Sequence, residues 1–227
     1  MKQLTRRELA AMIDHTLIRS TATKTEVTKL CQEAKKYHFA SAVVNPYYIP
    51  LVSKLLKGTD VKTCSTIGFP MGTTLTEIKA AETKKVIELG AQELDMVMNI
   101  SALKSKDYKT TKTDIQTVVE TAKNTDKNII IKVIIETGFL TDPEKILACK
   151  IVKQAGADYV KTSTGLFSGG ATETDIKLMR QTVGKKMGVK AAGGIRTLKT
   201  ALAMIEAGAN RIGTSAAIQI IEEIPQT

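Results

Sequence analysis

Hydrophobic and polar residues follow one another along the sequence in two patterns, one typical of amphipathic helices and one typical of short buried strands. From Thr23 the sequence reads T-K-T-E, which can close a capping box, and apolar residues from Val27 to Ala34 recur every three or four positions. The next apolar stretch, residues 39–44, is short and stops at Asn45-Pro46. This pattern predicts a helix followed by a strand.

The same passage from helix to strand recurs three times, each time with a glycine at the junction. The sequence reads ELGAQELDMV around Gly90, KQAGADYVKT around Gly156 and EAGANRIGT around Gly208. Glycine ends a helix readily because it adopts the left-handed conformation at low cost. These three glycines therefore predict junctions at which a helix stops and a buried strand begins.

Helix starts and strands can be placed along the whole chain. Capping residues precede apolar periodic segments at Thr23, Asp142-Pro143, Thr172 and Thr197. Eight apolar strands are predicted between the helices, near Ala11–Asp14, Ser41–Val44, Lys62–Ile67, Glu93–Met98, Ile129–Ile135, Asp158–Lys161, Gly188–Ala192 and Asn210–Gly213.

Eight short strands that alternate with helices predict a parallel sheet with helices outside it, because parallel strands need a crossover connection. We expect an α/β protein, a single (β/α)8 TIM barrel over residues 1–227 with a short helical segment before the first strand. An open, doubly wound sheet of eight strands is the alternative. In either fold, chemistry is expected at the C-terminal ends of the strands.

Composition indicates a folded globular protein with a basic surface. Of the 227 residues, 43% are hydrophobic and 25% are charged, which excludes intrinsic disorder. A net charge of +10 makes nucleic-acid binding an alternative, but the lysines are scattered and only 4% of residues are aromatic. We therefore expect small anionic metabolites, and not nucleic acid, as partners.

Cysteine usage and hydropathy predict a cytoplasmic protein. The three cysteines are odd in number and lie in apolar or periodic segments, which indicates buried free thiols in a reducing compartment. The first nine residues are polar, and no run of about eighteen apolar residues occurs. We expect neither export nor membrane insertion.

Lysines inside apolar strands are the main chemical signal. Lys161 and Lys190 each follow an apolar strand residue, and Lys132 lies in the middle of another strand. Burial and a second nearby cation both lower the pKa of a lysine, and a neutral amine is a nucleophile toward carbonyls. Asp14 and Asp95 could offset the charge or move protons. The alternative is that these five residues form a structural ion network without chemistry.

Glycines after the last strands predict an anion site. Gly165, the pair Gly193-Gly194, and the segment from Gly213 to Ser215 offer backbone amides near a helix start. The loops after the seventh and eighth strands of a TIM barrel often bind phosphate.

Metal binding is not expected. The sequence has only two histidines and no cluster of ligands at zinc spacing. His38 is expected at a helix end, and His15 is expected beside the site, where it would orient a neighbouring side chain.

Several motifs resemble those of the deoxyribose-phosphate aldolases. They are KTSTG at 161–165, KAAGGIR at 190–196, KVIIET at 132–137, IDHTL at 13–17 and ELDMV at 93–97, within a resemblance that runs roughly from Glu8 to Ile221. The resemblance implies a class I aldolase that reversibly cleaves 2-deoxy-D-ribose 5-phosphate to acetaldehyde and D-glyceraldehyde 3-phosphate in deoxynucleoside catabolism. It also implies that no cofactor is needed and that the chain forms a homodimer or homotetramer.

The resemblance assigns roles to individual residues. Lys161 would form the Schiff base, Lys190 would keep it partly neutral, and Asp95 would handle protons together with water. The expected substrate-binding residues are Asp14, Thr16, Lys132 and Thr162 around the sugar and Gly165, Gly193, Gly194, Gly213 and Ser215 around the phosphate.

The sequence departs from the family pattern at three positions. Val43 replaces a cysteine that many relatives carry and that has no required role. Leu166 stands where some members have a lysine, and Ala216 where many have a serine, so fewer phosphate contacts are expected. Without the C-terminal tyrosine of some members, proton transfer is expected to rely on Asp95, Lys190 and water. The alternative enzyme is a phosphate-binding isomerase or lyase that uses Asp95 and a lysine without a covalent intermediate.

Overall fold

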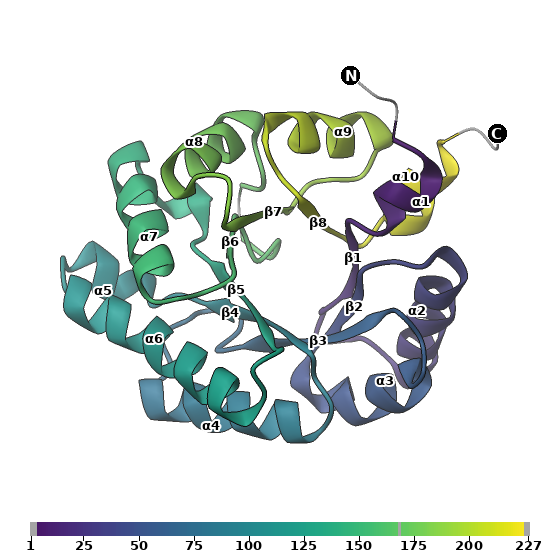
Figure 1. Cartoon of the computed structure of the whole chain (residues 1–227), viewed down its shortest axis with the longest axis horizontal. Helices are drawn as coiled ribbons and strands as arrows, with labels where there is room; N and C mark the ends of the chain where they lie inside the picture. Colours follow the sequence, from purple (N-terminus) through teal and green to yellow (C-terminus); the bar gives the residue numbers. More distant parts are fainter. Residues whose placement is uncertain (1–3, 168, 225–227) are drawn as a thin grey trace.

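Eight parallel strands close into a barrel in a computed structural model of the chain, which describes residues 4–167 and 169–224. Each strand pairs with the next along the chain, and β8 returns to pair with β1. Figure 1 looks down this ring of strands and shows the helices outside it. The strands are β1 (Ile13–Leu17), β2 (Ser41–Val44), β3 (Lys62–Ile67), β4 (Glu93–Val97), β5 (Ile130–Ile134), β6 (Tyr159–Lys161), β7 (Gly188–Ala192) and β8 (Arg211–Thr214).

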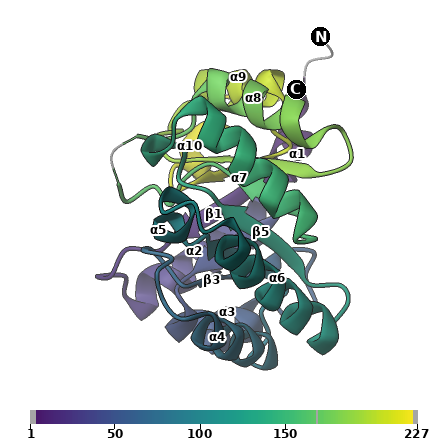
Figure 2. The same ribbon diagram turned by 90° about the vertical axis from the view of Figure 1, so that its left-hand side faces the viewer.

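Helices cover the outside of the barrel. Figure 2 shows the molecule from the side, with the helices labelled α5, α6 and α7 on the face turned to the viewer. The helices are α1 (Arg6–Ala10), α2 (Lys24–Tyr37), α3 (Ile49–Leu56), α4 (Thr76–Glu88), α5 (Ile100–Lys104), α6 (Tyr108–Thr125), α7 (Asp142–Gln154), α8 (Glu173–Val183), α9 (Leu198–Ala207) and α10 (Ala217–Glu222), with the 3-10 helices η1 (Pro46–Tyr48) and η2 (Thr137–Phe139).

The closed barrel confirms the predicted TIM barrel, and the alternative of an open sheet is wrong. Closure is direct, since Asp14 of β1 lies opposite Gly213 of β8 in the strand register. The short helix expected before the first strand is α1. The outermost residues of the predicted domain, 1–3 and 225–227, lie outside the described residues, as does residue 168.

Seven of the eight predicted strands agree with the structure to within one residue at each end, but the first strand was predicted wrongly. It runs from Ile13 to Leu17, and not from Ala11 to Asp14. Thr5 and Glu8 close a capping box that starts α1, and the chain completes a turn after this helix before it can extend. Asp14, expected at the end of the strand, therefore lies inside it.

The predicted helix ends are largely confirmed. The hydroxyls of Thr23, Thr172 and Thr197 accept hydrogen bonds from backbone amides three residues later. At α7 the cap is Thr141 and not Asp142, because Thr141 forms a capping box with Glu144 and leaves Asp142 as the first helical residue.

The three predicted helix-to-strand junctions are also confirmed. Gly90, Gly156 and Gly208 have φ values of 106°, 84° and 119°, in the region that favours glycine. Each of them directly follows the last turn of a helix and precedes a strand.

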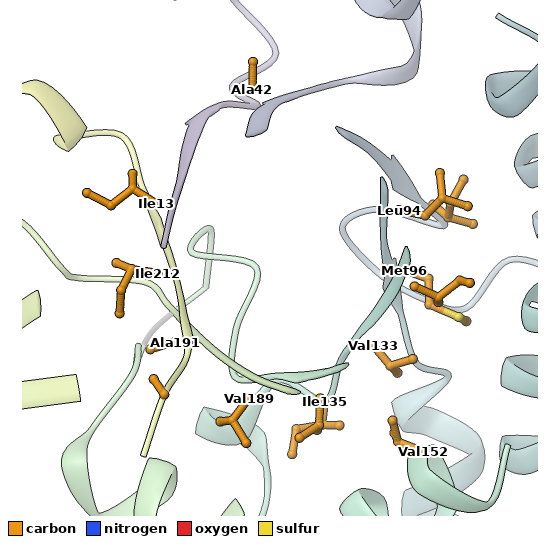
Figure 3. Packing of buried hydrophobic residues seen from close by; sticks show 14 of the residues in the cluster. Ile13, Ala42, Leu94, Met96, Val133, Ile135, Val152, Val189, Ala191 and Ile212 are labelled. Carbon is orange, nitrogen blue, oxygen red and sulfur yellow. The ribbon is translucent and has the colours of Figure 1, made fainter. Parts of the chain in front are cut away.

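The apolar core lies between the strands and the helices, while the inside of the barrel is charged. On β4, Leu94 and Met96 join the apolar cluster, and the alternate residues Glu93 and Asp95 face the interior. Figure 3 shows that the labelled side chains of Ile13, Leu94, Met96, Val133, Val189 and Ile212 leave the strands on the outer side of the ring. One face of such a strand therefore packs in the apolar layer under the helices, and the other face lines the charged interior of the barrel.

Two further properties of the structure concern the cysteines and the lengths of the helices. Cys31, Cys64 and Cys149 are buried free thiols, as predicted. Within residues 4–167 and 169–224, no helix combines the length and the apolar character that a membrane span requires.

We predict that Leu94→Ala lowers the free energy of unfolding by about 2–5 kcal/mol, because it leaves a cavity in the layer between sheet and helices. Urea denaturation measures this change. Leu202→Ala on α9, where the side chain is 39% exposed, serves as the control and should cost much less. Equal losses in the two variants would contradict the placement of the core.

Candidate active site

A cavity of about 250 Å³ opens at the C-terminal ends of β1, β6, β7 and β8. The loops after these strands supply most of its lining. Seven of the predicted site residues line it, namely Thr16, Lys161, Gly165, Gly193, Gly194, Gly213 and Ser215. The remaining predicted residues, Asp14, Asp95, Lys132, Thr162 and Lys190, are fully buried around and beneath its floor.

Lys161 forms part of the cavity lining, where β6 ends. Only 3% of the residue is exposed, and its Nζ donates a hydrogen bond of 2.5 Å to Oδ2 of Asp95 on β4. Lys190 lies opposite Lys161 in the register of β6 and β7, and its Nζ donates to the same oxygen at 2.7 Å. The structure thus brings the three residues expected to be catalytic into contact through one carboxylate oxygen.

The two lysines have opposite pKa shifts. Burial lowers the pKa of Lys161, and although Asp95 opposes this effect, the positive charge of Lys190 adds to it. Burial also acts on Lys190, but Asp14 and Asp95 outweigh it and raise the pKa of this lysine. Lys161 therefore releases its proton more easily, while Lys190 stays cationic.

Both aspartates are held ionised. Burial alone would raise the pKa of Asp95, but the attraction of Lys132, Lys161 and Lys190 lowers it well below its usual range. The pKa of Asp14 is also lowered, because Lys190 and Lys132, with Arg211, outweigh the effect of burial.

Six buried groups form a closed ring of ion pairs beneath Lys161, which we call the ion ring. The shortest nitrogen–oxygen distances around it are Asp95–Lys132 2.9 Å, Lys132–Glu93 2.7 Å, Glu93–Arg211 3.3 Å, Arg211–Asp14 2.8 Å, Asp14–Lys190 2.5 Å and Lys190–Asp95 2.7 Å. The ring contains three cations and three carboxylates, so it carries no net charge. Lys161 is attached to it through Asp95 as a seventh group.

Glu93 and Arg211 were not among the predicted site residues. One signal for Glu93 was present, because it precedes Asp95 by two positions on one strand and therefore faces the same side. Arg211 begins β8, and its guanidinium lies 5.7 Å from the centre of the Tyr159 ring. No sequence pattern pairs these two strands, since the contact depends on how the barrel closes.

Small neutral groups make room for the ion ring. Ser41 donates a hydrogen bond of 2.6 Å to Oδ1 of Asp14. Cys64 lies next to Asp95 and Lys132, and burial raises the pKa of its thiol, so it stays neutral. A side chain at position 213 would crowd Lys190, because a Cβ there would lie 3.0 Å from the Cε of that lysine. Gly213 therefore admits the lysine stem as well as lining the cavity.

Two residues hold the loop that carries Gly165. The hydroxyl of Thr162 donates to the carbonyl of Ala192 at 2.9 Å and accepts from its amide at 3.0 Å, so it joins the ends of β6 and β7. Its contacts in the structure are thus with backbone groups. Oε2 of Glu136 accepts a hydrogen bond of 2.9 Å from the amide of Thr164.

The outer end of the cavity offers groups suited to an anion. The backbones of Gly193 and Gly170 pack closely, since a Cβ on Gly193 would lie 3.0 Å from the Cα of Gly170. Arg19 and Arg196, which were not predicted, also line the cavity. Arg19 is ion-paired with Glu26 of α2, and this contact is the main reason that the pKa of Glu26 falls to about 2.

Leu166 is the apolar part of the cavity mouth, with 51% of the residue exposed. Its side chain is uncharged, whereas the lysine that some family members have at this position would add a positive charge to the cavity mouth. The neighbouring arginines therefore supply the positive charge at this end of the cavity.

His38 lies at the helix end where it was expected, but His15 does not lie beside the cavity. His38 caps the end of α2 and contacts Asp60 at 2.9 Å. His15 bonds to Glu33 of α2 at 2.8 Å and packs against the ring of Phe39, which places it between β1 and α2. Over residues 4–167 and 169–224, no group of three or more histidine, cysteine or acidic side chains is arranged to hold a metal ion.

The barrel and its pair of buried lysines, Lys161 in the cavity lining and Lys190 beneath it, define the class of protein, a TIM-barrel aldolase. A family model described as DeoC/LacD family aldolase matches residues 9–220. The chain belongs to this family, which confirms the resemblance seen in the motifs.

Similar proteins agree with this assignment. The chain is 60% identical to the deoxyribose-phosphate aldolase of Clostridium tetani (strain Massachusetts / E88), over 95% of this chain and 99% of that one. It is 55% identical to the deoxyribose-phosphate aldolase of Thermoanaerobacter sp. (strain X514), over 95% and 96% of the two chains. The tetrameric deoxyribose phosphate aldolase of Aeropyrum pernix is 36% identical, with a TM-score of 0.90, over 96% of this chain and 92% of that one.

The lowered pKa values of Asp14 and Asp95 predict that the fold loses stability in acid. In the unfolded chain these carboxyls have pKa values of about 3.9, so it takes up protons before the native state does. Their contribution to the free energy of unfolding is complete above about pH 5 and decreases as the pH falls below about 4. Urea unfolding over this range measures it. Asp14→Asn should weaken the acid dependence, and an unchanged dependence would contradict the assignment.

Proposed function

We propose that the protein is a deoxyribose-phosphate aldolase that reversibly cleaves 2-deoxy-D-ribose 5-phosphate to acetaldehyde and D-glyceraldehyde 3-phosphate. The observation that carries the proposal is the buried Lys161, whose pKa is lowered and which lines a cavity with cationic groups at its mouth. The names of the relatives support the same substrate.

The cavity suits an open-chain sugar phosphate held by its two ends. The aldehyde carbon C1 would lie at Lys161, and the phosphate would lie among the glycine loops near Gly165 and Ser215. Thr16 lines the cavity between these ends. Asp14 and Lys132 would support the site from the barrel interior, where both are fully buried. Thr162 would support it by joining the ends of β6 and β7.

The first chemical step is the formation of a protonated imine. The neutral amine of Lys161 attacks C1, a nitrogen–carbon bond forms, and the carbonyl oxygen takes up protons and leaves as water. Lys190 stays cationic, and Asp95 with bound water can pass the protons between the nitrogen and the departing oxygen.

The second step breaks the bond between C2 and C3. A base, Asp95 acting through water, removes the proton of the C3 hydroxyl, and the oxygen electrons form the new aldehyde. The electrons of the C2–C3 bond move to C2 and the imine nitrogen, which gives an enamine and releases D-glyceraldehyde 3-phosphate. Protonation of C2 and hydrolysis of the imine then release acetaldehyde. The imine itself is the electron sink, so the proposed reaction needs no cofactor.

The proposal extends to assembly and location. The relative from Aeropyrum pernix is described as a tetramer, which supports a homodimer or homotetramer for this chain. Buried free thiols support a cytoplasmic location, and we take residues 1–227 as one catalytic domain. Light scattering after size-exclusion chromatography measures the assembly.

We predict that borohydride, added with 2-deoxy-D-ribose 5-phosphate, traps the imine as an irreversible mass increase on the tryptic peptide that contains Lys161. Lys161→Leu should abolish turnover and trapping while the circular dichroism spectrum stays unchanged. Lys177→Leu on the outer surface of α8 is the matched control and should retain both.

The competing proposals give different results in this experiment. An isomerase or lyase that works without a covalent intermediate would turn over substrate but give no trapped peptide. Activity that is lost in EDTA would indicate a metal enzyme, whereas the proposed chemistry is insensitive to chelators. An adduct found only on other lysines would also contradict the role of Lys161.

We predict that Arg19→Leu raises KM for 2-deoxy-D-ribose 5-phosphate by roughly tenfold, because it removes a cation from the anion end of the cavity. The value of kcat/KM for unphosphorylated 2-deoxyribose should stay the same. Lys24→Leu, at the start of α2 and outside the cavity lining, is the control. An equal loss of kcat/KM with both sugars would show that Arg19 does not bind the phosphate.

A further inference from the structure

The ion ring extends beyond the residues that can touch substrate. Glu93 and Arg211 begin strands β4 and β8, whereas the cavity opens at the opposite ends of the strands, and neither residue lines it. We propose that the ion ring sets the fraction of Lys161 that is unprotonated, and that Glu93 and Arg211 are positioning residues that hold the ring at zero net charge. This inference rests on the proposed Schiff-base role of Lys161.

The arrangement of contacts supports the proposal. Each charged group of the ring contacts at least two groups of opposite sign, and a further pair of 3.7 Å between Lys132 and Asp14 crosses the ring, so every ring cation meets two or more carboxylates. Lys161 contacts only Oδ2 of Asp95, which already lies 2.7 Å from Lys190. Within the part of the chain that the structure describes, Lys161 is therefore the barrel cation that has no carboxylate of its own.

Burial makes this charge balance effective at Lys161. The six ring residues are between 0% and 9% exposed, so water screens their charges poorly. Adding or removing one unit charge in such an interior shifts the pKa of a group several ångströms away by about one unit. Arg19 and Arg196 at the mouth are exposed, and solvent screens them more strongly.

The groups that face Lys161 come from several strands. They are Cys64 of β3, Asp95 of β4 and Lys190 of β7. Asp14 of β1 and Lys132 of β5 lie one step further along the ring, because Asp14 contacts Lys190 and Lys132 contacts Asp95. Burial raises the pKa of Cys64, so its thiol adds no charge near neutral pH. The balance at Lys161 is thus decided by the carboxylates and cations of the ring.

Removing a negative charge from the ring and removing a positive charge should shift the pKa of Lys161 in opposite directions. Glu93→Gln leaves the ring with one excess positive charge, which disfavours the protonated form of Lys161 and lowers its pKa. Arg211→Met leaves one excess negative charge, which favours the protonated form and raises that pKa. A purely structural role would weaken the fold in both variants without moving the pKa in opposite directions.

The experiment uses the full chain and acetaldehyde as the probe. The rate at which borohydride-trapped imine accumulates on Lys161 is measured against pH. We expect the acid limb of this profile to move by about one pH unit, to lower pH in Glu93→Gln and to higher pH in Arg211→Met. Glu93→Asp and Arg211→Lys preserve the charges of the ring. In these two variants the acid limb should lie at the same pH as in the unsubstituted protein.

Two further variants keep the test decisive if a single substitution prevents folding. The double variant Glu93→Gln/Arg211→Met removes both charges, leaves the ring neutral, and should restore the original limb. Asp14→Asn removes the same charge as Glu93→Gln at another point of the ring and should move the limb the same way. A limb that stays fixed in these variants, or that moves in the same direction in Glu93→Gln and Arg211→Met, overturns the inference. If no imine forms on Lys161 in the unchanged chain, the proposed function fails as well, so the two failures are distinguishable.

Discussion

One oxygen atom, Oδ2 of Asp95, accepts hydrogen bonds from two ammonium groups inside the barrel, and the chemistry of the site depends on this sharing. A single carboxylate oxygen cannot fully compensate two buried cations, so one of them has to give up its proton more readily. Lys190 has a second carboxylate in Asp14, whereas Lys161 has none. The opposite pKa shifts of two chemically identical side chains therefore come from the number of anions that each one meets.

The fold produces this arrangement through strand alternation and barrel closure. Residues two apart on a strand face the same side, so a strand can give apolar side chains to the layer under the helices, as Figure 3 shows, while its alternate side chains face the interior. On β4 these alternate side chains are the carboxylates of Glu93 and Asp95. Closure then places Arg211 of β8 next to Asp14 of β1. In an open sheet, these two edge strands would lie far apart, and the ring of ion pairs would stay incomplete.

Sequence reasoning found the barrel, the two strand lysines and the glycine loops because each of them leaves a local signal. Lys161 and Lys190 stand out as charges after apolar strand residues, and Gly90 and similar glycines mark helix ends. The start of the first strand was missed because the capping box at Thr5 decides it. The contribution of Arg211 was missed for a different reason, because an ion pair between residues 197 positions apart depends on barrel closure and leaves no local pattern.

The position of Lys161, below the mouth of the cavity and above the ion ring, has a kinetic consequence for the proposed reaction. The ring fills the barrel beneath the lysine, so both products have to leave through the same opening. In the proposed reaction the three-carbon phosphate fragment would lie nearer to this opening, while the two-carbon fragment would still be bonded to Nζ of Lys161. Release would therefore be ordered, with the phosphorylated aldehyde first, and in the direction of synthesis acetaldehyde would have to enter before its acceptor.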